Sequence, residues 1–243
     1  MNAEETAEKL TAWIKEIVTS TGHSGTVLGL SGGIDSSVLG VLCRRAFPES
    51  TLGLIMPCHS IDEDRIHAET MAKQFSIRTV LVPLDGIYDT FLKVLPELQA
   101  DDSRRRMAGA NLKARLRMST LYYTANQLRY LVAGSGNRSE LTVGYFTKFG
   151  DSGVDILPLG NLVKAEIREL AGYLGIPREI VVKPPSAGLW EGQTDEGEMG
   201  FTYADLDRYI LTGKAPPEIK RRIDAMKSAS RHKLALPPIA RFD

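Results

Sequence analysis

The sequence predicts a single α/β domain, residues 1–243, with a doubly wound, mostly parallel sheet of about five strands flanked by helices. Short apolar runs that fit buried strands alternate with longer segments whose apolar residues recur at helical spacing. Each of the first three runs leads into such a segment, which is the connection that parallel strands need. With 43% hydrophobic and 25% charged residues, the chain has the composition of a globular protein that can bury a core.

The expected elements follow in order along the chain. An amphipathic helix spans 3–20, and strands or extended pieces are expected at 26–30, 51–56, 78–82, 130–133 and 154–159. Further helices are expected at 36–45, 60–75, 85–98, 111–128, 138–143, 162–174, 201–211 and 217–228. Ser60 and Glu63 have the spacing of a capping box that would begin the third helix. The arginines at 104–106 are expected to start a polar turn with a solvated face; the alternative is contact with phosphate.

A glycine-rich turn follows the first expected strand. Ser31, Gly32 and Gly33 lead into a helical segment that carries Asp35 and Ser36 at its start. Glycines let backbone N–H groups approach an anion, and a helix N-terminus favours negative charge. The turn matches neither G-x-x-x-x-G-K-[ST] nor G-x-G-x-x-G. We expect a phosphate site in which Asp35 would hold Mg²⁺; the alternative is a tight turn without a ligand.

Other segments are expected at the same edge of the sheet, because ligands of α/β sheets bind beyond the carboxyl ends of the strands. The backbone around Met56 and Pro57 either borders an adenine or forms an ordinary strand-end loop. After the fourth strand a glycine turn leads to Glu140, a second plausible Mg²⁺ ligand. The long segment 183–200, rich in Gly and Pro, is predicted to be a lid over substrate that includes Trp190.

Charge and cysteine usage exclude several classes of function. Thirty basic and thirty acidic residues cancel, which argues against a dedicated nucleic-acid surface. No apolar run approaches the roughly 20 residues of a membrane span, and the acidic start of the chain is unlike a signal peptide, so we expect a cytoplasmic protein. Cys43 and Cys58 are expected to be buried thiols in a reducing compartment. The wide apolar surface of the 111–128 helix suits a subunit interface.

Four stretches together resemble the ammonia-dependent NAD synthetases, within the N-type ATP pyrophosphatase superfamily of adenine nucleotide alpha hydrolase-like folds. They are 29–36, 111–118, 144–151 and 183–196. The stretch 29–36 by itself indicates only the superfamily, whereas 144–151 and 183–196 indicate the ammonia-dependent NAD synthetases. The resemblance implies amidation of deamido-NAD with ammonia and ATP, giving NAD, AMP and pyrophosphate through an adenylated nicotinate carboxylate. The alternatives are an ATP pyrophosphatase that adenylates another carboxylate or base, and a nucleotide-binding regulator without turnover.

The resemblance also implies roles for individual residues. Asp151 would place or deprotonate ammonia, and Asp35 with Glu140 would bind Mg²⁺. ATP would be bound by Gly29, Leu30, Ser31, Gly32, Gly33, Ile34, Asp35, Ser36, Ser135, Lys164 and Ser186. Deamido-NAD would be bound by Arg115, Lys148, Asp155, His232 and Lys233. Many members carry Thr in place of Ser135 and Ser186, and Glu before the His-Lys pair where this chain has Arg231.

The resemblance further implies a homodimer with deamido-NAD lying partly across the subunit boundary, and neither nucleic acid nor a membrane as partner. Residue 2 is Asn, not the Cys of an N-terminal glutaminase nucleophile, and no glutaminase domain is evident in the sequence. Free ammonia is therefore the expected nitrogen source, unless a separate glutaminase subunit delivers it.

Overall fold

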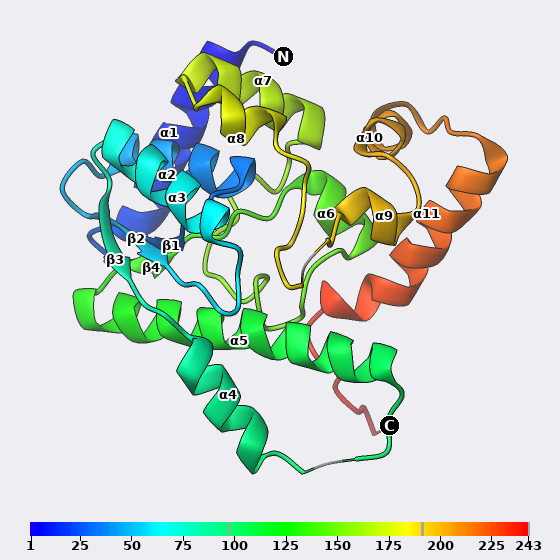
Figure 1. The fold of residues 1–243 in the computed structure, drawn as a ribbon. Coiled ribbons are helices and arrows are strands. Elements are labelled where there is room, and N and C mark those ends of the chain that lie inside the picture. The colour runs from blue at the N-terminus through cyan, green and yellow to red at the C-terminus, as the bar shows by residue number, and fades with distance from the viewer. Residues whose placement is uncertain (97, 191, 243) are drawn as a thin grey trace.

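The computed structural model describes residues 1–96, 98–190 and 192–242. Its centre is a parallel sheet of four strands in the order β3-β2-β1-β4 (Figure 1). The strands are β1 Thr26–Gly29, β2 Thr51–Ile55, β3 Arg78–Leu81 and β4 Leu131–Val132. Thr26 pairs with Thr51 on one side and with Leu131 on the other.

The sheet has one strand fewer than the sequence predicts. Within the described residues, the expected piece at 154–159 is reduced to a single parallel bridge between Ala133 and Ile156. Pro158 has no N–H to donate to a ladder, and the chain turns back where the Gly160 N–H donates to the Leu157 carbonyl.

Helices cover both faces of the sheet, as predicted (Figure 1). They are α1 Ala3–Ser20, α2 Ile34–Ala46, α3 Asp62–Gln74, α4 Asp85–Val94, α5 Asp102–Leu128, α6 Arg138–Val143, α7 Lys164–Leu174, α8 Arg178–Val182, α9 Asp195–Met199, α10 Tyr203–Thr212 and α11 Pro217–Ser230. Leu28 of β1 packs in a core with α1, α2, α3 and α7, whereas its neighbour Val27 packs in a second core with α5. A third core joins α6, α9, α10 and α11, which gather beyond one side of the sheet.

The capping box predicted from Ser60 and Glu63 does not form, and α3 begins two residues after Ser60. Ser60 Oγ instead accepts hydrogen bonds from the Cys58 N–H and from Arg117 Nη2, each at 3.2 Å. Arg117 Nε also donates to the Met56 carbonyl at 3.1 Å. The Arg117 guanidinium of α5 therefore bonds the Ser60 hydroxyl that was predicted to cap α3. Its bonds to Ser60 and to the Met56 carbonyl fix the turn after β2.

The polar turn predicted at 104–106 is also wrong, because these arginines lie in the first turns of α5. Asp101 caps that helix by accepting from the Arg104 N–H at 2.8 Å, so the helix begins well before residue 111. The helix predicted at 85–98 ends at Val94, and Glu97 lies outside the described residues.

The two cysteines are free and buried, as expected. Burial raises the pKa of the Cys43 thiol to about 12. Among the helices of the described residues, none is long and apolar enough to cross a membrane.

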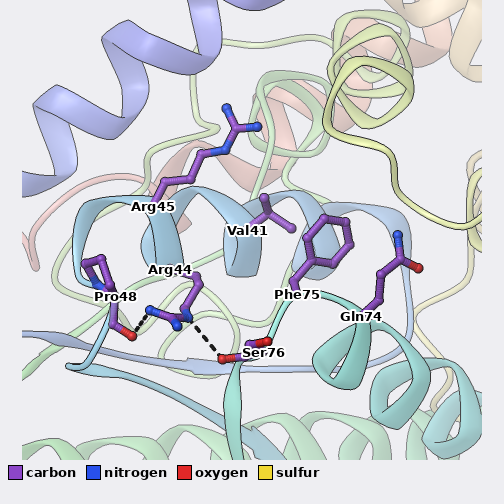
Figure 2. A pocket seen from close by; sticks show the side chains of 7 residues that line it. All are labelled: Val41, Arg44, Arg45, Pro48, Gln74, Phe75 and Ser76. Carbon is purple, nitrogen blue, oxygen red and sulfur yellow. Dashed lines mark hydrogen bonds between the residues drawn. The ribbon is translucent and has the colours of Figure 1, made fainter.

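A shallow hollow of about 320 Å³ lies between the C-terminal half of α2 and the end of α3 (Figure 2). Arg44 Nε donates to the Ser76 carbonyl at 3.0 Å, and Arg44 also bonds the Pro48 carbonyl. The guanidinium thus joins two loops, and the hollow lies at the opposite end of α2 from the glycine turn. It is lined by Val41, Arg44, Arg45, Pro48, Gln74, Phe75 and Ser76.

Candidate functional site

The glycine turn connects β1 to the N-terminus of α2, as the sequence predicts. Gly33 is the N-cap residue and supplies no side-chain cap, so N–H groups of the first helical turn remain for a ligand. Ser36 Oγ accepts from the Ser31 N–H at 3.2 Å and donates to the Gly33 carbonyl at 3.0 Å. These bonds fold the turn around a helix N-terminus, which is an arrangement that suits an anion.

Gly32 is the position where the turn needs glycine. Its φ is +76°, and a Cβ atom there would lie 2.1 Å from the Asp64 carbonyl oxygen of α3. A side chain would therefore both strain the backbone and push α3 away. The Asp64 carboxylate accepts from Lys183 Nζ at 2.6 Å, so α3 also connects the turn to the base of the 183–200 segment.

Asp35 meets Lys164 and two residues of the turn after β4. Its Oδ2 lies 2.5 Å from Lys164 Nζ, and its Oδ1 accepts from Asn137 Nδ2 at 2.9 Å. Glu140 Oε1 lies 3.7 Å from the same ammonium, which also lies 4.9 Å from the centroid of the Tyr203 ring. Two carboxylates and one buried lysine, from α2, α6 and α7, are thus brought together beside the glycine turn.

The buried ionisable groups of this cluster shift one another's pKa values. Burial, and then the neighbouring Asp35, raise the pKa of Glu140 to about 8. Burial by itself would lower the pKa of Lys164, but Asp35 and Glu140 outweigh it and raise that pKa to about 12. Lys164 is therefore a cation at neutral pH, and the cluster holds more acidic groups than basic ones.

We predict that the free energy of unfolding falls as the pH rises from about 5 to 8. Folded Glu140 keeps its proton up to about pH 8, whereas an unfolded glutamate loses it near 4.5, so the folded state binds more protons in this window. Urea unfolding of Glu140→Gln should show a smaller fall across that window than the wild type. Glu16→Gln, an exposed site on α1, should follow the wild type. An identical pH dependence in the wild type and Glu140→Gln would contradict the shift.

The donor set is suited to a magnesium ion that arrives on a nucleotide. In residues 1–96, 98–190 and 192–242, no three His, Cys, Asp or Glu side chains are placed to hold a metal ion by themselves. Mg²⁺ at phosphate-transfer sites is usually held by one or two carboxylates, with phosphate oxygens and water as further ligands. Asp35 matches that requirement, and Glu140 does so in its ionised form, which a bound cation would favour; both side chains lie beside the glycine turn.

A second group of the predicted residues forms a connected cluster near the C-terminus. Arg115 Nη2 donates to the Lys148 carbonyl at 3.3 Å, and Lys148 Nζ donates to the His232 carbonyl at 2.6 Å. Lys233 Nζ donates to the Gly144 and Phe146 carbonyls, each at 2.9 Å. His232 participates here through its backbone, while its Nδ1 lies 3.1 Å from the Ala229 carbonyl. Four of the five residues predicted to bind the dinucleotide therefore lie together.

The remaining predicted residues lie in different surroundings. Asp151 Oδ1 accepts from the Thr147 N–H at 2.8 Å, in the loop that carries Lys148. Asp155 lies apart, where it accepts from the Tyr122 hydroxyl at 2.9 Å and from the Val132 N–H at 2.8 Å. Ser135 follows β4 at the carboxyl edge of the sheet. In the 183–200 segment, Ser186 Oγ accepts from the Gly188 N–H at 3.1 Å; Glu191 lies outside the described residues.

Sequence reasoning missed two side chains of the site. Asn137 caps α6 and forms a reciprocal capping box with Glu140, and its N-x-x-E spacing before the predicted 138–143 helix was a usable signal. Tyr203 contacts Lys164 only because α10 folds back on α7, so no local pattern pointed to it.

The chain is similar to known proteins over almost its whole length. The family model described as NAD synthase matches residues 6–237. The NH(3)-dependent NAD(+) synthetase of Carboxydothermus hydrogenoformans is 50% identical over 239 residues, which cover 98% of each chain. An NMN synthetase structure from Francisella tularensis is 36% identical, with a TM-score of 0.95 and full coverage of both chains. An NH3-dependent NAD synthetase structure from Campylobacter jejuni is 28% identical, with a TM-score of 0.83 and coverage of 99% of this chain and 100% of that one.

Proposed function

We propose that this chain, which belongs to the NAD synthase family, amidates deamido-NAD with ammonia at the expense of ATP. The observation that carries the proposal is the glycine turn with Asp35, Glu140 and Lys164 beside it, in a chain that matches the family over residues 6–237. The products are NAD, AMP and pyrophosphate.

The chemistry requires activation of a carboxylate, because its leaving group in a direct attack by ammonia would be oxide. Attack of the nicotinate oxygen on the α-phosphorus of ATP forms a mixed anhydride and releases pyrophosphate. Ammonia then adds to the acyl carbon and AMP departs. The protein has to align these groups and stabilise charge on the departing pyrophosphate, and fixed dipoles and cations do this well in a site shielded from water.

In this proposal the cluster beside the glycine turn binds ATP, and the cluster around Lys148 and Lys233 binds the acid that is activated. The N–H groups of the turn 31–36 and the Lys164 ammonium would hold the phosphates, with Asp35 and Glu140 holding Mg²⁺, which supplies further neutralisation of phosphate charge when bound. Arg115, Lys148 and Lys233 would hold the dinucleotide acid through its phosphates and carboxylate. We assign to Asp151 the placing of ammonia, because its loop carries Lys148.

The test is a complete turnover assay with ¹⁵N-ammonium, ATP, Mg²⁺ and deamido-NAD. We expect labelled NAD, AMP and pyrophosphate in equal amounts, and less product with glutamine as nitrogen donor. Release of ADP and phosphate, or AMP release that does not require deamido-NAD, would refute the proposal. Binding of ATP without pyrophosphate release would favour a regulator instead.

A second candidate acceptor is nicotinate mononucleotide, since the Francisella tularensis structure at TM-score 0.95 is an NMN synthetase. The activation chemistry is the same, because both acids carry the nicotinate carboxylate. The ratio of kcat/KM for the two acids decides between them. A preference of more than about tenfold for the mononucleotide, corresponding to about 1.4 kcal/mol, would replace deamido-NAD as the assigned substrate.

We further propose that the 183–200 segment is a lid held partly closed by Lys113. This buried lysine of α5 donates from Nζ to the Leu189 carbonyl at 2.9 Å, and its ammonium also lies 5.5 Å from the Tyr88 ring. The segment is folded on itself, since the Asp195 N–H donates to the Pro185 carbonyl at 3.0 Å.

Lys113→Met should open the lid, because it removes the only charge-assisted bond from α5 to the Leu189 carbonyl that the described residues show. We expect faster proteolysis in the 183–200 segment without substrates, protection when ATP and deamido-NAD are added, and a raised KM. Lys15→Met, on the exposed face of α1, should leave both unchanged. Equal cleavage rates in the wild type and Lys113→Met would count against the latch.

We also propose that two copies of the chain form a homodimer through α4. Every residue of α4, all of it within the described part of the chain, is at least partly exposed, although the helix is amphipathic. A large exposed apolar face of this kind usually marks an interaction site. The apolar side chains exposed on α4 and just beyond it are Ile87, Phe91, Leu92, Val94 and Leu95.

Phe91→Asp should convert the dimer to monomers, because a carboxylate in the centre of a buried interface cannot be solvated. Analytical ultracentrifugation should give twice the 26.7 kDa chain mass for the wild type and a single chain mass for the variant. Ile66→Asp, which alters a similarly exposed apolar residue on α3, should remain dimeric. A monomeric wild type would remove this part of the proposal.

A further inference from the structure

A buried carboxylate outside the phosphate cluster joins the two helices that carry Glu140 and Lys164. Asp207 of α10 is 4% exposed. Its Oδ1 accepts from Ser139 Oγ at 2.6 Å, and its Oδ2 accepts from the Ala165 N–H at 2.8 Å. Ser139 precedes Glu140 in α6, and Ala165 follows Lys164 in α7. One side chain of α10 therefore contacts the immediate neighbour of each charged residue.

The same contacts complete the N-terminus of α7. Its N-cap residue, Val163, has no side-chain acceptor for the first helical N–H groups. Ser139 Oγ accepts from the Lys164 N–H at 3.1 Å, while Asp207 accepts from the next N–H along. A cap that normally comes from the helix itself is thus supplied by α6 and α10, and the start of α7 is fixed relative to them.

A second residue of α10 contacts the other end of the lysine. Tyr203 lies one helical turn before Asp207, on the same face of α10. Its ring lies 4.9 Å from Lys164 Nζ, and its hydroxyl donates to Asp195 Oδ2 at 2.9 Å. The helix therefore supports Lys164 at the ammonium through Tyr203 and at the backbone through Ser139 and Asp207.

We propose that Asp207, acting through Ser139 and the start of α7, is a positioning residue that holds the Lys164 ammonium against Asp35 for the ATP-dependent step. This rests on the proposed function, in which Lys164 contacts ATP. Asp207 touches neither the Asp35 carboxylate nor the glycine turn among its hydrogen bonds in the described residues, so its effect passes through α7. Displacement of a catalytic group by about 1 Å can lower the rate by as much as roughly 100-fold.

The test compares Asp207→Asn and Ser139→Ala with Asp205→Asn, a control on the same helix. Among the residues that the structure describes, Asp205 bonds only to Thr202 and Arg208, within α10 and its cap. We expect kcat/KM for ATP to fall about 10- to 100-fold in Asp207→Asn and less in Ser139→Ala. Asp205→Asn should stay within about twofold of the wild type.

A double-mutant cycle separates positioning from a merely structural role. If Asp207 acts through Lys164, adding Asp207→Asn to Lys164→Met should lower the rate no further. Multiplying effects, or a wild-type rate in both Asp207→Asn and Ser139→Ala, would overturn the inference. If Asp207→Asn does not fold, the cycle with Ser139→Ala decides alone.

The inference and the proposed function can fail separately. A crystal structure of Asp207→Asn, or of Ser139→Ala, reports the position of Lys164 without any turnover. An ammonium shifted away from Asp35 would support the positioning role even if the wild type forms no NAD, whereas an unmoved ammonium would refute that role in an active enzyme.

Discussion

Replacing Asp35 with asparagine should lower kcat about 100- to 1,000-fold while leaving the fold intact. The size is that observed when one preorganised electrostatic contact is removed from a site where charge develops. Asn is nearly isosteric, but only its oxygen accepts, so it keeps the bond from Asn137 or the bond from Lys164 and loses the other. What is lost is the carboxylate charge that would hold Mg²⁺ and that faces Lys164 Nζ at 2.5 Å.

The stability cost should be smaller than the catalytic one. Breaking a buried ion pair costs about 3–5 kcal/mol when one charge is left without compensation. Glu140, 3.7 Å from the same ammonium, ionises more readily once the Asp35 charge is gone and then compensates Lys164, so we expect a smaller loss than that. Asp62→Asn, in the exposed first turn of α3, is the matched control and should leave both rate and stability unchanged. A wild-type kcat in Asp35→Asn would remove Asp35 from the metal-binding role.

Local sequence patterns predicted the parts of the fold that depend on neighbouring residues. The run at 26–30, the glycines after it and the apolar spacing of the next helix are all contained within about twenty residues, and β1, the turn and α2 formed as expected. Gly175 ends α7 with φ +76°, as a glycine stop signal predicts. These features need no information from the rest of the chain.

The errors arise where tertiary contacts override a local preference. Ser60 has capping-box spacing, but a guanidinium from α5 takes its hydroxyl. The arginines at 104–106 look like a turn, but Asp101 begins a helix ahead of them. At the site, Asp35 and Glu140 could be identified from residue type and strand ends, whereas the support from Tyr203 and Asp207 depends on how α10 packs against α6 and α7. The chemical type of a site residue can be read from the sequence. The side chains that support it can be identified only once the fold is known.

Replacing Lys164 with methionine should have the largest combined effect on catalysis and stability. Met has a similar length and removes only the ammonium, which is 2.5 Å from Asp35 and is buried with its side chain 3% exposed. We expect kcat/KM for ATP to fall about 100- to 1,000-fold, because α7 then lacks the ammonium that we propose to face the phosphates. Steady-state pyrophosphate release at saturating deamido-NAD measures this loss.

The same substitution should destabilise the fold in a pH-dependent way. The buried Asp35 carboxylate loses its cation, so the free energy of unfolding should drop by about 3–5 kcal/mol near pH 7. The pKa of Glu140, already raised to about 8 by burial and Asp35, must rise further without Lys164. Below about pH 7 Glu140 is protonated in both proteins and their difference should be constant, whereas it should grow as the pH rises through 8, where only the wild type releases this proton readily.

Urea unfolding of Lys164→Met and of the wild type at pH 7 and pH 9 measures this effect. Lys220→Met removes a lysine from an exposed pair with Asp224 and should leave the stability nearly unchanged at either pH. A pH-independent difference would mean that Asp35 and Glu140 do not share the Lys164 charge. In that case the Lys164 ammonium would contribute packing but no charge to the cluster. The proposal that the cluster binds a cation carried by the nucleotide would then lose its support.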